Sequence, residues 1–86
     1  MAHSVSARKR VRQAAKRRGA NAGMRSMFRS SIKKVLAAVE AGDKDAASAA
    51  LQQAIPVIDR TAGKGLIHRN TAARHKGRLA KRVEAL

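Results

Sequence analysis

The first 34 residues carry eleven Lys or Arg side chains and no Asp or Glu. Between Met1 and Gly23 the only large aliphatic residues after the initiator methionine are Val5 and Val11. A segment with so much like charge and so little apolar surface cannot fold on itself. It needs a partner that neutralises the charge. A polyanion is the natural candidate, because each cation that contacts a phosphate releases condensed counterions. This block therefore predicts nucleic acid as the partner.

The apolar residues suffice for one small core. The chain has 86 residues, and burial alone stabilises a domain of this size only marginally. Hydrophobic residues make up 44% of it, but half of these are alanine, which packs helices closely and buries little area. The core must come from a short set of larger side chains. The candidates are Phe28, Ile32, Val35, Leu36, Val39, Leu51, Ile55, Val57, Ile58, Leu66, Ile67, Leu79, Val83 and Leu86.

Charge divides the chain into three parts. Residues 1–34 carry +11, residues 35–59 carry −3 and residues 60–86 carry +7, for a total of +15. The absence of cysteine excludes disulfides and thiolate metal sites and fits a reducing cytosol. No apolar run has the length of a membrane span or of a secretory signal core. A basic, acid-poor start also suits a mitochondrial transit peptide, whose removal would leave a chain that is still basic and still needs a partner.

Helix-forming residues dominate, and the aromatic and β-branched runs typical of strands are missing. An apolar stripe at helical spacing runs from Met24 to Val39. One and two heptads before Met24, the same face carries Arg17 and Arg10, so it changes from apolar to cationic near Gly23. We predict one long helix whose second half packs and whose first half projects.

Two turns divide the rest of the chain. Gly42 is a good C-terminal stop, and Asp43 is placed to cap the next helix. The second turn spans residues 63–65. Pro56 lies inside the second helix and predicts a kink. The expected inward residues are Ala47, Leu51, Ala54, Ile55 and Ile58 on the second helix and Ala72, Leu79, Val83 and Leu86 on the third. The helices are expected over residues 6–41, 44–61 and 67–85.

The predicted fold class is therefore all-α. The architecture is a three-helix bundle with a long, projecting basic first helix. Residues 1–86 form a single domain, in which residues 1–22 are a basic helical arm and residues 23–86 are the three-helix bundle.

A second cationic segment spans residues 64–76. It opens with a glycine turn at the expected start of the third helix, where free backbone amides and the helix dipole favour a phosphate. His68 and His75 are seven residues apart and hence on one helix face, with Arg74 and the nearby Arg78. In the ordinary interpretation the glycine only turns the chain and the polar residues only meet solvent. We predict hydrogen bonds to phosphates or 2′-hydroxyls from His68, Arg69, Asn70 and Arg74.

The nucleic acid is expected to be recognised by its backbone and shape. Phe28 is the only aromatic residue, so the stacking platforms of single-strand readers are absent. Neither zinc-finger spacing nor the helix pair of a DNA-recognition unit is evident. Charge alone also permits a small histone-like DNA compactor, which should show little preference between folded RNA and duplex DNA. A membrane-active cationic peptide is disfavoured, because the basic segment lacks the Trp, Phe and Leu face that such peptides bury.

Neither metal binding nor catalysis is expected. The histidines are not four residues apart, and no third ligand stands near them. The carboxylates cluster at the middle turn, where capping explains Asp43 and Asp45, and no plausible Ser-His-Asp set or cysteine nucleophile exists. We therefore expect a protein that is not an enzyme and that uses no cofactor, metal or small-molecule substrate.

Several stretches of the chain, in order and over essentially its whole length, resemble one known family. They are AHSVSARKRVRQ at residues 2–13, RSM at 25–27 with IKKV at 32–35, GDK at 42–44, and above all the segment from DR at 59–60 through KGLIHRN at 64–70 and AARHK at 72–76 to RLA at 78–80. Together these stretches are specific, although none is a motif of catalytic grade. The chain resembles the bacterial ribosomal protein S20 family of the small subunit.

The resemblance implies a three-helix structural constituent of the ribosome that binds the small-subunit ribosomal RNA directly and early in assembly and stabilises its fold. It also implies a cytoplasmic ribonucleoprotein of translation, with that RNA and neighbouring ribosomal proteins as partners and no membrane. Gly63 and Gly77 depart from the family's pattern, and a mid-helix Gly77 costs about 1 kcal/mol relative to alanine. Carried over by position, the implied RNA-binding residues are Arg8, Lys9, Arg10, Arg12, Lys16, Arg17, Arg18, Asn21, Arg25 and Arg29, followed by Lys64, His68, Arg69, Asn70, Arg74 and Lys76.

Overall fold

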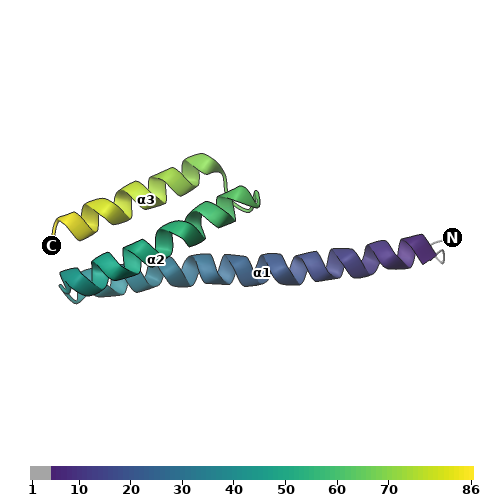
Figure 1. Ribbon diagram of the computed structural model, residues 1–86, viewed down its shortest axis with the longest axis horizontal. Helices are drawn as coiled ribbons and strands as arrows, with labels where there is room; N and C mark the ends of the chain where they lie inside the picture. The colour runs from purple at the N-terminus through teal and green to yellow at the C-terminus, as the bar shows by residue number, and fades with distance from the viewer. Residues whose placement is uncertain (1–4) are drawn as a thin grey trace.

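The computed structural model describes residues 5–86, which form three helices. In chain order these are α1 (Val5–Glu40), α2 (Lys44–Gly63) and α3 (Arg69–Glu84). Figure 1 shows that α2 folds back along the second half of α1, that α3 follows α2, and that the first half of α1 extends beyond both. The predicted all-α class and the long first helix are confirmed. Residues 1–4 of the predicted arm lie outside the described part of the chain.

The length of α1 sets the shape of the molecule. Its 36 residues, at about 1.5 Å each, span roughly 54 Å. The longest dimension is 61 Å, whereas the other two are 22 and 14 Å. The radius of gyration is 17.5 Å, against about 12 Å for a compact chain of this length. A large part of α1 therefore lies outside any globular packing.

The first turn matches its sequence signals. Gly42 has a φ of 73°, a left-handed conformation that glycine adopts without strain. The N–H of Asp43 donates to the carbonyl of Ala38 (3.1 Å) and that of Gly42 to Val39 (3.0 Å), so the last carbonyls of α1 are satisfied. The Asp43 carboxylate then accepts from the N–H of Ala46 at 3.1 Å and caps α2. This tight reversal makes α1 and α2 antiparallel neighbours.

The second turn lies later than predicted. It is Gly65, with a φ of 76°, that takes the left-handed position, and Gly63 is still the last residue of α2. The N–H of Leu66 donates to Thr61 and that of Gly65 to Ala62, the same capping pattern as at the first turn. Of the two glycines in this turn, only Gly65 has a positive φ, so α2 continues through Gly63. Helix α2 therefore runs two residues beyond its predicted end, and α3 begins at Arg69, two residues beyond its predicted start.

The core lies where the three helices meet. Val35 and Ile58 are the largest apolar side chains that are fully buried. The buried Thr61 hydroxyl donates to the carbonyl of Val57 at 2.7 Å, so its burial leaves no polar atom unpaired. The buried apolar residues are Val35, Ala47, Ala54, Ile58, Ala72, Leu79 and Val83, with Phe28, Ile32, Leu36, Val39, Leu51 and Ile67 partly buried against them.

Two predicted core residues lie at the surface. Ile55 is 36% exposed, because the covered face of α2 follows Ala54 and Ile58 and leaves position 55 on its flank. Leu86 is 39% exposed, because α3 ends at Glu84 and carries it past the bundle. Val57 and Leu66 are half-buried. Helix α2 continues through the exposed Pro56, so the proline does not end the helix, and the kink stays a prediction.

Truncation of Ile58 should destabilise the protein far more than truncation of Ile55. We expect Ile58→Ala to cost about 2–5 kcal/mol, because it leaves a cavity in a core with few large side chains. Ile55→Ala removes the same atoms from a partly solvated site and should cost about 1 kcal/mol or less. Chemical denaturation of both variants measures the difference. Equal losses would show that position 55 is packed as tightly as position 58.

Candidate nucleic-acid interface

The arm, by which we mean residues 5–22, is a cationic helix exposed along its length. It carries Arg8, Lys9, Arg10, Arg12, Lys16, Arg17 and Arg18, all of them exposed, and no acidic residue. Figure 1 shows the arm beyond the ends of α2 and α3. Apolar packing of α1 begins with the half-buried Met24 and Phe28. Because no carboxylate stands near, these side chains are available to an external polyanion.

The cations of the arm point in every direction. Successive helical residues are about 100° apart, so Arg10 and Arg17 continue the face of Met24. Lys9 and Lys16 lie on one flank of that face. Arg18 lies on the other flank, and Arg8 and Arg12 lie toward the back. This arrangement suits a helix with phosphates on several sides better than one lying on a single flat surface.

His68 begins α3 as its N-cap. Its Nδ1 accepts from the N–H of Asn70 at 3.0 Å. The tautomer that can accept at Nδ1 carries its proton on Nε2, and the side chain is exposed. The prediction that the glycine turn opens the third helix is wrong. Gly65 caps α2 and stands four residues before Arg69, so its amide serves that turn and not the start of α3.

His75 does not share a face with His68. His68 precedes the helix, so the seven-residue spacing does not apply. His75 is half-buried, and its ring meets Phe28 of α1 edge-on, with centroids 5.5 Å apart at 86°. It therefore belongs to the packing of α3 on α1. Lys76 is held as well, since its Nζ lies 2.7 Å from Oδ1 of Asp59 on α2.

The outer face of α3 presents a cationic stripe. Asn70, Arg74, Arg78 and Lys81 are exposed and recur at intervals of four, four and three residues. This spacing places them on one side of the helix. Arg78 and Lys81 were not among the residues that the resemblance implies. Their signal in the sequence was this periodicity alone, counted from Asn70.

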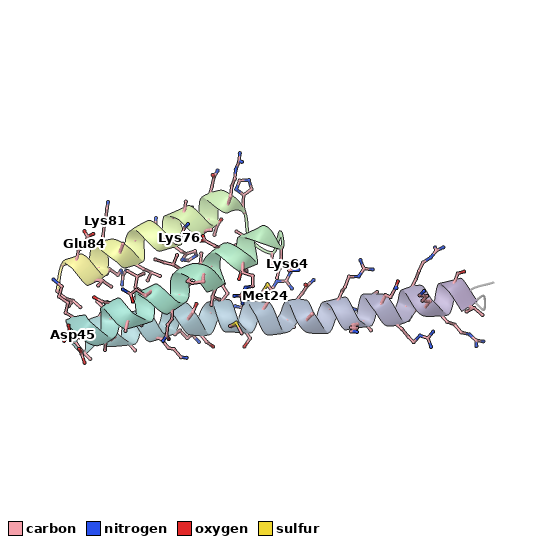
Figure 2. The ribbon with its side chains drawn as sticks, in the orientation of Figure 1. Met24, Asp45, Lys64, Lys76, Lys81 and Glu84 are labelled. Carbon is pink, nitrogen blue, oxygen red and sulfur yellow. The ribbon has the colours of Figure 1, made fainter. Side chains whose placement is uncertain are left out.

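The molecule is electrically polarised along its length. Glu40, Asp43 and Asp45 lie at the turn between α1 and α2, and Glu84 ends α3. Figure 2 shows Asp45 and Glu84 toward one end of the bundle, and Lys64 and Met24 toward the other, from which the arm projects. The remaining acidic residue, Asp59, is paired with Lys76. Positive charge is therefore most concentrated at the arm end, whereas at the opposite end these carboxylates stand among Lys44, Lys81 and Arg82.

The predicted RNA-binding residues divide into two groups. Asn21 and Lys76 are half-buried. The others are exposed on the arm, on α1 just beyond it, in the turn after α2 and on α3: Arg8, Lys9, Arg10, Arg12, Lys16, Arg17, Arg18, Arg25, Arg29, Lys64, His68, Arg69, Asn70 and Arg74.

Residues 5–86 show neither a metal cluster nor a membrane-spanning helix. No three His, Asp or Glu side chains of this part come close enough to hold a metal ion. None of its helices combines the length and the apolar character that a membrane crossing requires. The candidate site is made of the charged surfaces of the arm and of α3.

These features define a small, strongly basic helical protein whose surface suits a polyanion. Over residues 2–84 the chain matches the model of the family described as Ribosomal protein S20. It is 64% identical over its full length to small ribosomal subunit protein bS20 of Thioalkalivibrio sulfidiphilus, and 58% identical to the proteins of that name from Aliivibrio fischeri and Vibrio parahaemolyticus. Each alignment covers 100% of both chains.

The chain belongs to the ribosomal protein S20 family. The predicted family is thereby confirmed. A protein of this family is a structural constituent of the small ribosomal subunit and not an enzyme. It takes part in translation as a component of a ribonucleoprotein, which in the bacteria of these relatives lies in the cytoplasm.

Proposed function

We propose that this protein binds the small-subunit ribosomal RNA directly, through the arm and α3, and stabilises the fold of that RNA during assembly. The observation that carries the proposal is the arm, a helix with seven exposed cations, no acidic residue and no bundle around it. A helix of such like charge gains little from packing and much from phosphates.

The arm is suited to insertion between RNA segments. Its 18 residues extend about 27 Å, and a helix is about 10–12 Å wide with its side chains. Cations on every side can reach phosphates of more than one RNA strand at once. Such a helix joins segments that would otherwise repel each other, which is the physical sense of stabilising a folded RNA.

We further propose that the two parts of the single domain have different roles, one in folding and the other in RNA binding. Residues 23–86 form the bundle that folds around Val35 and Ile58, whereas residues 1–22 bind RNA. The start of α3 and the turn before it add a second contact, because Lys64, His68 and Arg69 are exposed there. The acidic end of the bundle stays off the RNA, and neighbouring ribosomal proteins contact the surface that the RNA leaves free.

Competition separates this function from compaction of DNA. The protein should prefer folded small-subunit ribosomal RNA over duplex DNA of equal length at matched salt, since the exposed cations on several sides of the arm suit phosphates of more than one RNA segment. Filter binding with both competitors measures the preference. Equal affinity for the two would favour the DNA compactor.

Site-directed cleavage tests the orientation of the protein on the RNA. The chain has no cysteine, so a single cysteine can carry an iron chelate that cleaves nearby RNA. We expect strong cleavage from Ser6→Cys on the arm and weak cleavage from Ala46→Cys at the acidic end, both of which are exposed sites. Strong cleavage from Ala46→Cys alone would reverse the proposed orientation.

A further inference from the structure

Helix α3 is anchored unevenly along its length. It buries two large apolar side chains, Leu79 and Val83, and both lie in its second half. In the first half only Ala72 is buried, and alanine contributes little area. Apolar packing therefore fixes the end of α3 more firmly than the half that bears Asn70 and Arg74.

Two neighbouring side chains hold this first half instead. The His75 ring meets Phe28 of α1 edge-on, and Lys76 Nζ lies 2.7 Å from Oδ1 of Asp59 on α2. Figure 2 places Lys76 between α3 and α2. Adjacent helical residues point about 100° apart, so the two side chains contact two different helices. Together with the buried Leu79 and Val83, they set the rotation of α3 about its own axis.

That rotation decides which cations face outward. With His75 on α1 and Lys76 on α2, the exposed side of α3 carries Asn70, Arg74, Arg78 and Lys81. A phosphate that approached Lys76 would compete with a carboxylate already at hydrogen-bond distance and would be repelled by it. Lys76 is therefore poorly placed to bind RNA, although the family resemblance includes it among the RNA-binding residues.

We propose that Asp59 is a positioning residue for RNA binding. Through Lys76 it holds α3 so that Arg74 and its stripe face the RNA, and Lys76 itself makes no phosphate contact. This inference rests on the proposed function of α3. The pair is not required for folding, because the Lys76 and Asp59 side chains are 35% and 51% exposed and half-exposed pairs contribute little to stability.

A charge swap tests the proposal. Lys76→Asp breaks the pair by placing two carboxylates together, and it should weaken binding to a small-subunit ribosomal RNA fragment. Adding Asp59→Lys restores the pair in reverse and should restore the affinity. Arg74→Asp is the matched control on the same helix, and Asp59→Lys should not rescue it. Failure of the swap to restore binding, or an unchanged affinity for Lys76→Asp, would overturn the proposal.

The salt dependence of binding is a second measurement that does not depend on small changes in folding. Arg74→Gln should lower the slope of log K against log salt by about 0.7–0.9, the value of one lost phosphate contact. The reversed pair, Lys76→Asp with Asp59→Lys, should keep the parental slope, because it preserves the contact between α2 and α3 and removes no phosphate contact. A lower slope in this double variant would place Lys76 on the RNA and overturn the inference. An unchanged slope in Arg74→Gln would instead count against RNA binding by α3, which is part of the proposed function.

Discussion

Removal of residues 2–21 should leave the melt of the free protein nearly unchanged and weaken RNA binding by several orders of magnitude at 0.1 M salt. The arm contains seven of the cations and none of the buried residues. If each cation contacts one phosphate, the deletion forfeits the release of about five or six counterions. The bundle keeps Val35, Ile58 and their neighbours, so its stability should persist.

The measurement is a thermal melt paired with a binding titration for each variant. A triple replacement of Arg10, Arg17 and Arg18 by Glu should weaken binding more than the same replacement by Gln, because repulsion then replaces attraction. Both triple variants keep the length and helix propensity of the arm. Loss of the cooperative melt on deletion would mean that the arm packs as core. Unchanged affinity would mean that α3 alone binds the RNA.

Binding should weaken steeply with salt. If the arm and α3 together neutralise roughly 6–10 phosphates, affinity should fall by about 10³–10⁵ between 50 and 200 mM salt. A titration at several salt concentrations gives the slope directly. An affinity that is nearly flat over this range would contradict an interface built on phosphate contacts.

The slope of log K against log salt for the full protein, compared with that for the protein without residues 2–21, locates the phosphate contacts. The protein without residues 2–21 should retain a shallower slope, which reports the cations on α1 beyond the arm, in the turn after α2 and on α3. The free arm should also fray in the absence of RNA, because its like charges repel and no tertiary packing supports it. Hydrogen exchange of arm amides with and without RNA measures this ordering.

Features that depend on local chemistry were predictable from the sequence. The stop at Gly42 and the cap at Asp43 need only a residue that tolerates positive φ and a side chain that accepts from a free amide. The change from cationic to apolar side chains near Gly23 follows from the spacing of residues along a single helix face. The same holds for the excess of cations, which indicates a polyanion before any fold is known.

Predictions that depended on contacts between residues far apart in the sequence were less accurate. Ile55 and Ile58 are equally apolar, and only the positions of α1 and α3 decide that the second is buried and the first is 36% exposed. The spacing of His68 and His75 indicated a shared face only on the assumption that both are helical. The turn expected over residues 63–65 contains two glycines, and only Gly65 takes the left-handed position.

The sequence by itself determined three helices, the first turn and a segment whose charge favours a polyanion, because propensity, capping and charge act between residues close in the chain. The tertiary structure alone decided which side of each helix is free. In the sequence Lys76 is one of several cations of α3, and only the structure shows Oδ1 of Asp59 on α2 2.7 Å from its Nζ. In the same way, only the structure shows that the His75 ring meets Phe28 edge-on. These contacts join residues far apart in the sequence, so their existence depends on how α3 is rotated against the other two helices.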